Sequence, residues 1–430
     1  MRFGYFSSAA VLTIVALGSA APIVQAQTPE AAAAQIAALR TQGSSGLQTF
    51  LQTYAQQLNL PLGTLPQPEV RAALDSLCQQ RDCHASRLYW YTDLEQAKAI
   101  AKAEGKPILS LRLLGRLDEE LSCANSRFFR IILYPNAQVS QVLRERFVLH
   151  WQSVRPVPKV SIDFGDGRKL ERTLTGNSIH YILDSAGRPI DALPGLYGPQ
   201  AFLRQLQQAE QAVQEYGRRQ GADRESFLQQ YHRDRLAAIQ TAWTADLKQA
   251  GITAVPKLAP LPEGVPTAEE ASRVAVSKMV VEMPLLMRIS LAAARNRTLL
   301  ETVTDQAAWV KLAELHRDDA RLDTSSRNLM RSKNPSLLAA TKSVPASTAD
   351  PFGALLSKFE AVIALDTVRN EYLLHNQIHQ WFVEGQTTDQ VETLNDRVYS
   401  QLFLTPSSDP WLGLLPADGY AAIENDGIRQ

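Results

Sequence analysis

Helix and strand signals alternate between residues 86 and 206, and this alternation constrains the fold more than any other feature of the sequence. Pro107–Leu114 is a short, nearly continuous apolar run, which is typical of a strand buried on both faces of a parallel sheet. Ahead of it, Thr92-Asp93-Leu94-Glu95 has the spacing of a capping box and precedes apolar residues at helical spacing. This order predicts an α/β unit.

The remaining elements of this unit follow from local periodicity and turn residues. In chain order they are a helix over Val139–Arg146, a strand over Phe147–Trp151, a hairpin of Val160–Phe164 and Lys169–Leu174 around Gly165-Asp166-Gly167, a strand over Ile179–Leu183, and a closing helix over Pro199–Tyr216. The hairpin is predicted because alternating residues flank a glycine-rich turn.

Several short runs within Tyr89–Leu206 are similar to those of one known superfamily. These runs are Lys106-Pro107-Ile108-Leu109, Phe147-Val148, Leu183-Asp184-Ser185-Ala186-Gly187 and Gly198-Pro199-Gln200-Ala201-Phe202-Leu203. With the order of helices and strands, they resemble the thioredoxin-like superfamily over somewhat more than a quarter of the chain. The resemblance implies a sheet whose first core strand leads to an active-site turn and a helix.

Active members of that superfamily carry Cys-x-x-Cys at the start of this helix, where the helix dipole stabilises a thiolate. The matching stretch here is Leu121-Ser122-Cys123-Ala124-Asn125-Ser126. The resemblance therefore implies that Cys123 takes the nucleophile position and that Ser126 replaces the resolving cysteine. Ser178 stands where the superfamily has a cis-proline that helps to bind the substrate chain.

The sequence allows two interpretations of Cys123. In one it is a reactive thiol, and in the other it is a small buried apolar residue. The acidic run Asp118–Glu120 would raise the pKa of the thiol, whereas Arg127 and Arg130 would lower it.

Cys78 and Cys83 lie five residues apart, just before the α/β unit. In an exported chain this spacing predicts a structural disulfide. Two alternatives stay open: a redox-active pair that serves Cys123, and a metal site that includes His84.

Glu371, His375 and His379 recur every four residues on a predicted helix, so they share one face. Two imidazoles and a carboxylate could hold a metal ion there. Histidines at this spacing also occur simply as surface or packing residues, and the order differs from the His-Glu-x-x-His of zinc proteases. The three residues are therefore weak metal candidates.

The sequence on either side of the α/β unit is helical in period. Residues 28–60 predict two short helices separated by Gly43-Ser44-Ser45-Gly46, and a third helix is expected over Glu69–Leu77. The last helices are expected over Phe359–Phe382 and Thr388–Leu402. We therefore expect an α/β thioredoxin-like domain joined to mostly α-helical N- and C-terminal regions. The expected divisions are a signal peptide at 1–26, a helical region at 27–85, the thioredoxin-like domain at 86–212 and a helical domain at 213–430.

The first 26 residues predict an export signal rather than part of the fold. Met1-Arg2 begin a short basic start, Ala9–Gly18 form an apolar stretch, and Val24-Gln25-Ala26 places small residues at a cleavage site. The apolar stretch is shorter than the ~20 residues that span a bilayer. We expect an exported protein, periplasmic or extracellular, with no stable membrane span.

Charge and motif content limit the classes of partner. The chain has 44 Lys and Arg residues and 44 Asp and Glu residues, so it lacks the positive field that attracts nucleic acid. It contains no Walker loop and no dinucleotide fingerprint, and we predict no cofactor. A protein partner or a protein thiol substrate is the expected class.

Two functional hypotheses follow, and one side chain separates them. The first is monothiol redox or thiol–disulfide activity at Cys123, which an exposed thiol at a helix start would favour. The second is a non-catalytic protein-binding or scaffold protein, in which the helical domain recognises a partner, and a buried Cys123 would favour it. Metal or haem handling at His375 and His379 is a third hypothesis, favoured if carboxylate and imidazole groups converge there.

Overall fold

The structure is a computed structural model of the chain. It describes residues 29–61, 64–173, 175–253, 306–333, 351–385, 389–406, 408 and 422–427. The predicted signal peptide lies outside the described residues. In the described ranges, no helix combines the length and the apolar character needed to cross a membrane.

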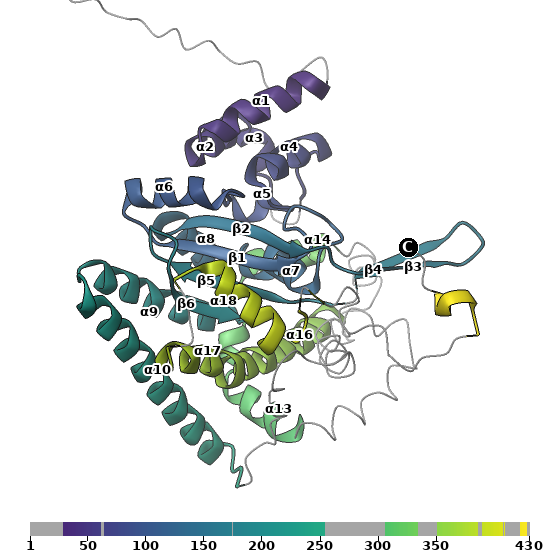
Figure 1. Cartoon of the computed structure of the whole chain (residues 1–430). Coiled ribbons are helices and arrows are strands. Elements are labelled where there is room, and N and C mark those ends of the chain that lie inside the picture. Colours follow the sequence, from purple (N-terminus) through teal and green to yellow (C-terminus); the bar gives the residue numbers. More distant parts are fainter. Residues whose placement is uncertain are drawn as a thin grey trace, which may run out of the picture.

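A four-stranded mixed sheet lies at the centre of the molecule (Figure 1). Its strands, in the spatial order β2-β1-β5-β6, are β2 (Val148–Arg155), β1 (Ile108–Leu114), β5 (Ser178–Leu183) and β6 (Pro189–Pro194). β1 runs parallel to β2 and antiparallel to β5, and β5 runs antiparallel to β6. Every residue of β1 is buried, which explains why the sequence of this strand is almost continuously apolar.

The two faces of the sheet pack against different helices. Successive side chains of a strand point to opposite faces. On one face, Arg112 of β1 binds Glu392 and Tyr181 of β5 donates to Asn395, both of α18 (Val391–Arg397). On the other face, His180 contacts Phe129 of the π-helical η2 (Phe129–Leu133) and Phe202 of α9 (Pro199–Gly217).

The helices of the α/β unit lie close to their predicted positions. They are α6 (Leu94–Glu104), α7 (Ala124–Phe128) with η2, α8 (Ala137–Arg146) and α9. The predicted capping box is corrected at one position: the N-cap of α6 is Asp93, whose side chain accepts from the backbone N–H groups of Glu95 and Gln96. Thr92 lies outside the helix because Asp93 already satisfies these two donors.

The N-terminal helices pack on the edge of the sheet that carries β2 (Figure 1). They are α1 (Pro29–Thr41), α2 (Ser44–Thr53), α3 (Ala55–Leu58), α4 (Pro68–Cys78) and α5 (Cys83–Ser86). The expected break at Gly43–Gly46 is shorter than predicted, because Gly46 lies inside α2. A Cβ atom there would meet the Leu39 carbonyl oxygen at 2.0 Å, so glycine serves the close packing of α1 on α2.

The described part of the C-terminal region is helical. Its elements are α10 (Ala222–Gln249), α13 (Gln306–Leu315), η4 (Arg317–Ala320), α14 (Thr324–Ser332), α16 (Pro351–Arg369), η5 (Asn370–His375), α17 (Asn376–Val383), α18, η6 (Val398–Leu402) and η7 (Glu424–Gly427). The helix predicted over Phe359–Phe382 starts eight residues earlier, with α16, and includes the π-helical segment η5.

The hairpin of β3 (Lys159–Asp163) and β4 (Lys169–Thr173) projects from the body of the molecule (Figure 1). It forms a separate two-stranded sheet, and Ile162 and Phe164 are exposed on it. Leu174, the predicted last residue of the hairpin, is outside the described residues.

The expected domain boundaries do not separate independent cores. The boundary after residue 85 cuts α5, and the boundary after residue 212 cuts α9. The buried apolar residues of all three regions form one continuous cluster. The reason is that helices distant in sequence, such as α18, cover the sheet directly.

Candidate functional site

Cys123, Ser126 and Ser178 lie together, where the start of α7 meets the start of β5. Cys123 is the N-cap of α7, and its Sγ accepts from the Ser126 backbone N–H at 3.4 Å. The side chain of Asn125 donates to Ser178 Oγ at 2.7 Å. The Cys123, Ser126 and Ser178 side chains are all buried, and Cys123 is 0% exposed.

The end of the helical region closes the surface beside Cys123. Tyr399 of η6 donates to the Asn177 carbonyl at 3.3 Å, and the Asn177 amide donates to Thr405 Oγ1 at 3.0 Å. Asn177 directly precedes Ser178, so η6 and Thr405 pack against the residue beside Ser178. Among the described residues, the Cys123 thiol is fully enclosed.

The two arginines near Cys123 are bound to other groups. Arg130 is buried and its Nη1 lies 3.0 Å from Asp82 Oδ2. Arg127 donates to the Ser122 carbonyl at 3.1 Å and to Thr173 Oγ1 at 2.8 Å. Both arginines therefore have structural contacts around the start of α7.

Cys78 and Cys83 are joined in a disulfide between the end of α4 and the start of α5. Both are buried, and the Cys83 backbone N–H donates to Asp75 Oδ1 at 2.9 Å. Since both sulfur atoms are in the disulfide, they do not form the metal site with His84 that the spacing left open. Burial lowers the pKa of His84 to about 4.

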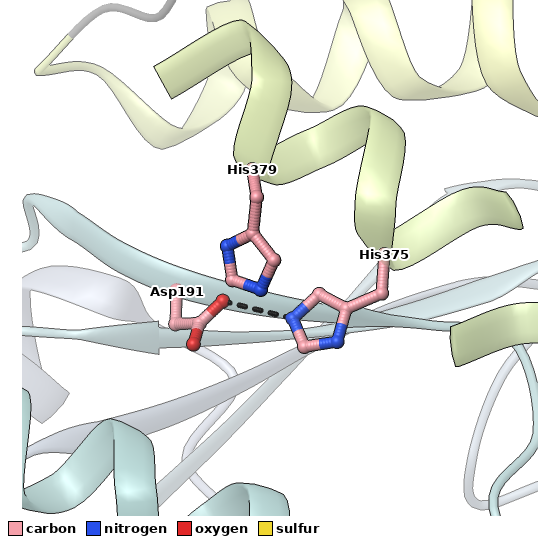
Figure 2. A group of neighbouring side chains, drawn as sticks. All are labelled: Asp191, His375 and His379. Atoms are coloured by element: carbon pink, nitrogen blue, oxygen red, sulfur yellow. Dashed lines mark hydrogen bonds and ion pairs between the residues drawn. The ribbon is translucent and has the colours of Figure 1, made fainter. Parts of the chain in front are cut away.

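A second buried cluster forms where β6 meets η5 and α17. Asp191 comes from β6, His375 ends η5, and His379 lies one turn later in α17 (Figure 2). His375 Nε2 lies 3.1 Å from Asp191 Oδ1. One ligand-type atom from each of the three side chains lies within 4.8 Å of the others.

One buried and two half-buried side chains contact this cluster from outside. Glu371 Oε2 lies 3.0 Å from His375 Nδ1, and the Tyr231 hydroxyl of α10 donates to Asp191 Oδ2. His232 Nδ1 lies 2.8 Å from His379 Nδ1. Of the three weak metal candidates, Glu371 lies on the Nδ1 side of His375, whereas Asp191, which the sequence pattern does not indicate, lies on the Nε2 side.

The ionisation of the cluster follows from burial and charge. Burial disfavours the His375 imidazolium, but Glu371 and Asp191 outweigh it and raise the pKa of His375 to about 9. Burial opposes the charge of Asp191 as well, yet the neighbouring imidazoles hold its pKa well below the usual range. Burial and the His375 charge lower the pKa of His379. The cluster therefore contains a charged Asp191–His375 pair beside a neutral His379.

A cavity of about 220 Å³ adjoins the cluster. It lies among α9, α10, η4 and the α16–η5 helix, and its wall includes Tyr197, Arg235 and Glu371. Glu371 lines this cavity and bonds to His375, so it links the cavity wall to the cluster. On the opposite wall, His316 lies 2.6 Å from Asp246 and 3.3 Å from Asp319.

Sequence reasoning found both histidines but missed Asp191. Asp191 stands in Pro189–Pro194, a run whose six residues are all buried. An aspartate inside an apolar strand needs a buried partner. This requirement is the sequence signal that points to Asp191 as part of a buried polar cluster. Its partner is 184 residues away, so local periodicity could not identify it.

Comparisons of this chain with protein-family models, with curated proteins and with solved structures found no match.

Proposed function

We propose that this chain is an exported binding protein, built on a thioredoxin-like sheet, in which Cys123 is a structural residue and the helical region recognises a protein partner. The burial of Cys123 carries this proposal. Its side chain is 0% exposed, and a thiolate must reach a disulfide to attack it. The N-cap contact and the contact of η6 with the neighbouring Asn177 give the thiol a packing role.

The order of elements supports the thioredoxin-like part of the proposal. The chain runs through α6, β1, a turn, α7 and α8, β2, the β3–β4 hairpin, β5, β6 and α9. The resemblance implies the same order of helix, strand, active-site turn, helix, strand, two further strands and closing helix. The β3–β4 hairpin takes the place of a crossover helix.

Alkylation tests whether the Cys123 thiol is unreactive in the folded protein. We expect iodoacetamide to leave Cys123 unmodified in the folded protein across pH 6–9 and to modify it after unfolding in guanidinium. Mass spectrometry locates the label, and a Cys123→Ala variant shows how much label other residues take up. Rapid labelling of the folded protein with an apparent pKa clearly below ~8.5 would overturn the proposal in favour of redox activity.

Export is tested by the N-terminus of the protein recovered from cells. We expect the mature chain to begin at Gln27 and to carry the Cys78–Cys83 disulfide, because disulfides persist in oxidising compartments. Recovery of an uncut chain from the cytosol would contradict this part.

Partner recognition is tested with a photo-crosslinking amino acid placed in α10. Ala238 is exposed and lines the cavity, and Gln229 is an exposed position on the same helix outside it. We expect a protein to crosslink reproducibly through position 238 and not through position 229. Equal labelling from both positions would contradict recognition at the cavity.

A further inference from the structure

We propose that Asp191, His375 and His379 form a binding site for one zinc ion. The proposal goes beyond partner recognition and does not depend on it. Two imidazoles and one carboxylate are a ligand set typical of zinc and neighbouring late transition metals, whereas magnesium and calcium prefer oxygen ligands alone.

The spacing of the ligand atoms suits one small cation. His375 Nε2 and Asp191 Oδ1 are 3.1 Å apart. Two ligand atoms at about 2.1 Å from a tetrahedral zinc ion are themselves about 3.4 Å apart, so the pair would open by only a few tenths of an ångström as zinc replaces the proton between the two atoms and that proton leaves to solvent. All three ligand-type atoms lie within 4.8 Å of one another. A short movement of the His379 side chain would therefore bring all three atoms to bonding distance from one ion.

His379 presents a nitrogen for which the protein supplies no partner. His379 is fully buried, and its Nε2 has no hydrogen-bond partner among the described residues. Figure 2 shows a ring nitrogen of His379 turned towards the Asp191–His375 pair. This nitrogen is Nε2, because Nδ1 contacts His232. A buried polar atom without a partner costs free energy, and a metal ion would satisfy it.

The outer contacts match those of metal-bound histidines. Such a histidine usually presents its second ring nitrogen to a carboxylate or another polar group, which fixes the ring and its tautomer. Glu371 does this for His375 at 3.0 Å, and His232 does it for His379 at 2.8 Å. Tyr231 orients Asp191 in the same way. With three protein ligands, a tetrahedral zinc ion would take a water molecule as its fourth ligand.

Metal analysis of the full mature chain tests the site. The protein is purified without a histidine tag, stripped with a chelator and dialysed against Zn²⁺. We expect one zinc ion per chain. Co²⁺ should give the visible absorption bands of a four-coordinate nitrogen and oxygen site, and zinc should displace it. A wild-type chain that binds no stoichiometric zinc would overturn the proposal and leave the three residues as a hydrogen-bonded core cluster.

Variants distinguish these three ligands from other metal-binding groups. His379→Asn keeps a polar group near His232 and removes Nε2, so we expect zinc affinity to fall by about tenfold or more. His316→Asn is the matched control, since His316 lies in the neighbouring network outside the ligand set, and it should still bind one zinc ion. Unchanged affinity in a folded His379→Asn protein would overturn the assignment.

An independent measurement covers the case in which His379→Asn does not fold. X-ray absorption of the zinc-loaded wild-type protein should show a nitrogen and oxygen shell with the outer scattering of two imidazoles. A sulfur shell, or a shell without imidazole, would exclude this site. Glu371→Gln, which keeps an amide beside His375, should weaken zinc binding by about 10–100-fold.

Discussion

Arg130 and Asp82 form a buried ion pair between η2 and the turn that the disulfide closes. Both side chains are almost inaccessible, and Lys333 adds a second cation 2.6 Å from Asp82. Removing one partner of a buried pair leaves the other charge without enough compensation. At this scale, stability depends on charges that are satisfied only in the folded state.

We predict that Arg130→Met lowers the free energy of unfolding by about 3 kcal/mol, because Asp82 stays buried with only Lys333 beside it. Urea unfolding followed by circular dichroism measures the change. Arg168→Met is the control: Arg168 is highly exposed in the hairpin, where it contacts Asp166 and the exposed Phe164 ring, so its change should stay within about 0.5 kcal/mol. Similar losses in the two variants would contradict the prediction.

His316 should make stability depend on pH. Its hydrogen bond to Asp319, together with Asp246, outweighs burial and raises the pKa of His316 in the folded state. The stabilisation is then fully present below the unfolded pKa of about 6.5 and is lost as pH rises through the folded pKa. We predict that His316→Gln costs more stability at pH 6 than at pH 9, as measured by urea unfolding. An equal cost at both pH values would show that His316 acts only by packing.

Among the strands, β3 and β4 form a hairpin that is separate from the central sheet. Ile162 and Phe164 are exposed, and its described strands pair only with each other. Its base is different, because Thr173 is buried and donates to the Ser122 carbonyl at 3.2 Å. The tip and the base should therefore contribute unequally to stability.

We predict that replacing residues 161–171 with Asn-Gly changes the free energy of unfolding by less than about 0.5 kcal/mol, since the deleted residues bury little apolar surface. Thr173→Val is the comparison, and the loss of its buried hydrogen bonds should cost about 1 kcal/mol or more. Thermal or urea unfolding gives both values. A shortened hairpin that destabilises more than Thr173→Val would mean that the tip packs against another part of the chain in solution.

At the scale of the whole molecule, the sheet depends on helices that follow it by many residues. Glu392 of α18 neutralises the buried Arg112, and Thr367 of α16 accepts from the Gly198 backbone N–H at the start of α9. Gly195 and Gly198 also lie so close to Asn370 and Asp319 that an added Cβ atom would clash.

We predict that residues 27–217, produced alone, do not form a packed native state, because truncation exposes one face of the sheet and leaves Arg112 unpaired. Near-ultraviolet circular dichroism and the sharpness of urea unfolding report this. The full mature chain is the control, and we expect it to show a cooperative transition. Cooperative unfolding of the truncated chain would instead show that the α/β unit is an independent domain.

The sequence alone determined most of the helices and strands, because they depend on residues close together in the chain. β1, β5 and α9 lie within one or two residues of their predicted positions, since apolar runs and turn residues act locally. The thioredoxin-like resemblance and export remain proposals that rest on the sequence.

Only the tertiary structure decided the state of the candidate sites. Cys123 is buried, and η6 packs on the neighbouring Asn177, a contact that no pattern near the cysteine could indicate. Asp191 joins His375 and His379 because β6 packs against η5. In each case the partners are far apart in sequence, and the free energy that pairs them comes from burying them together rather than from local propensity.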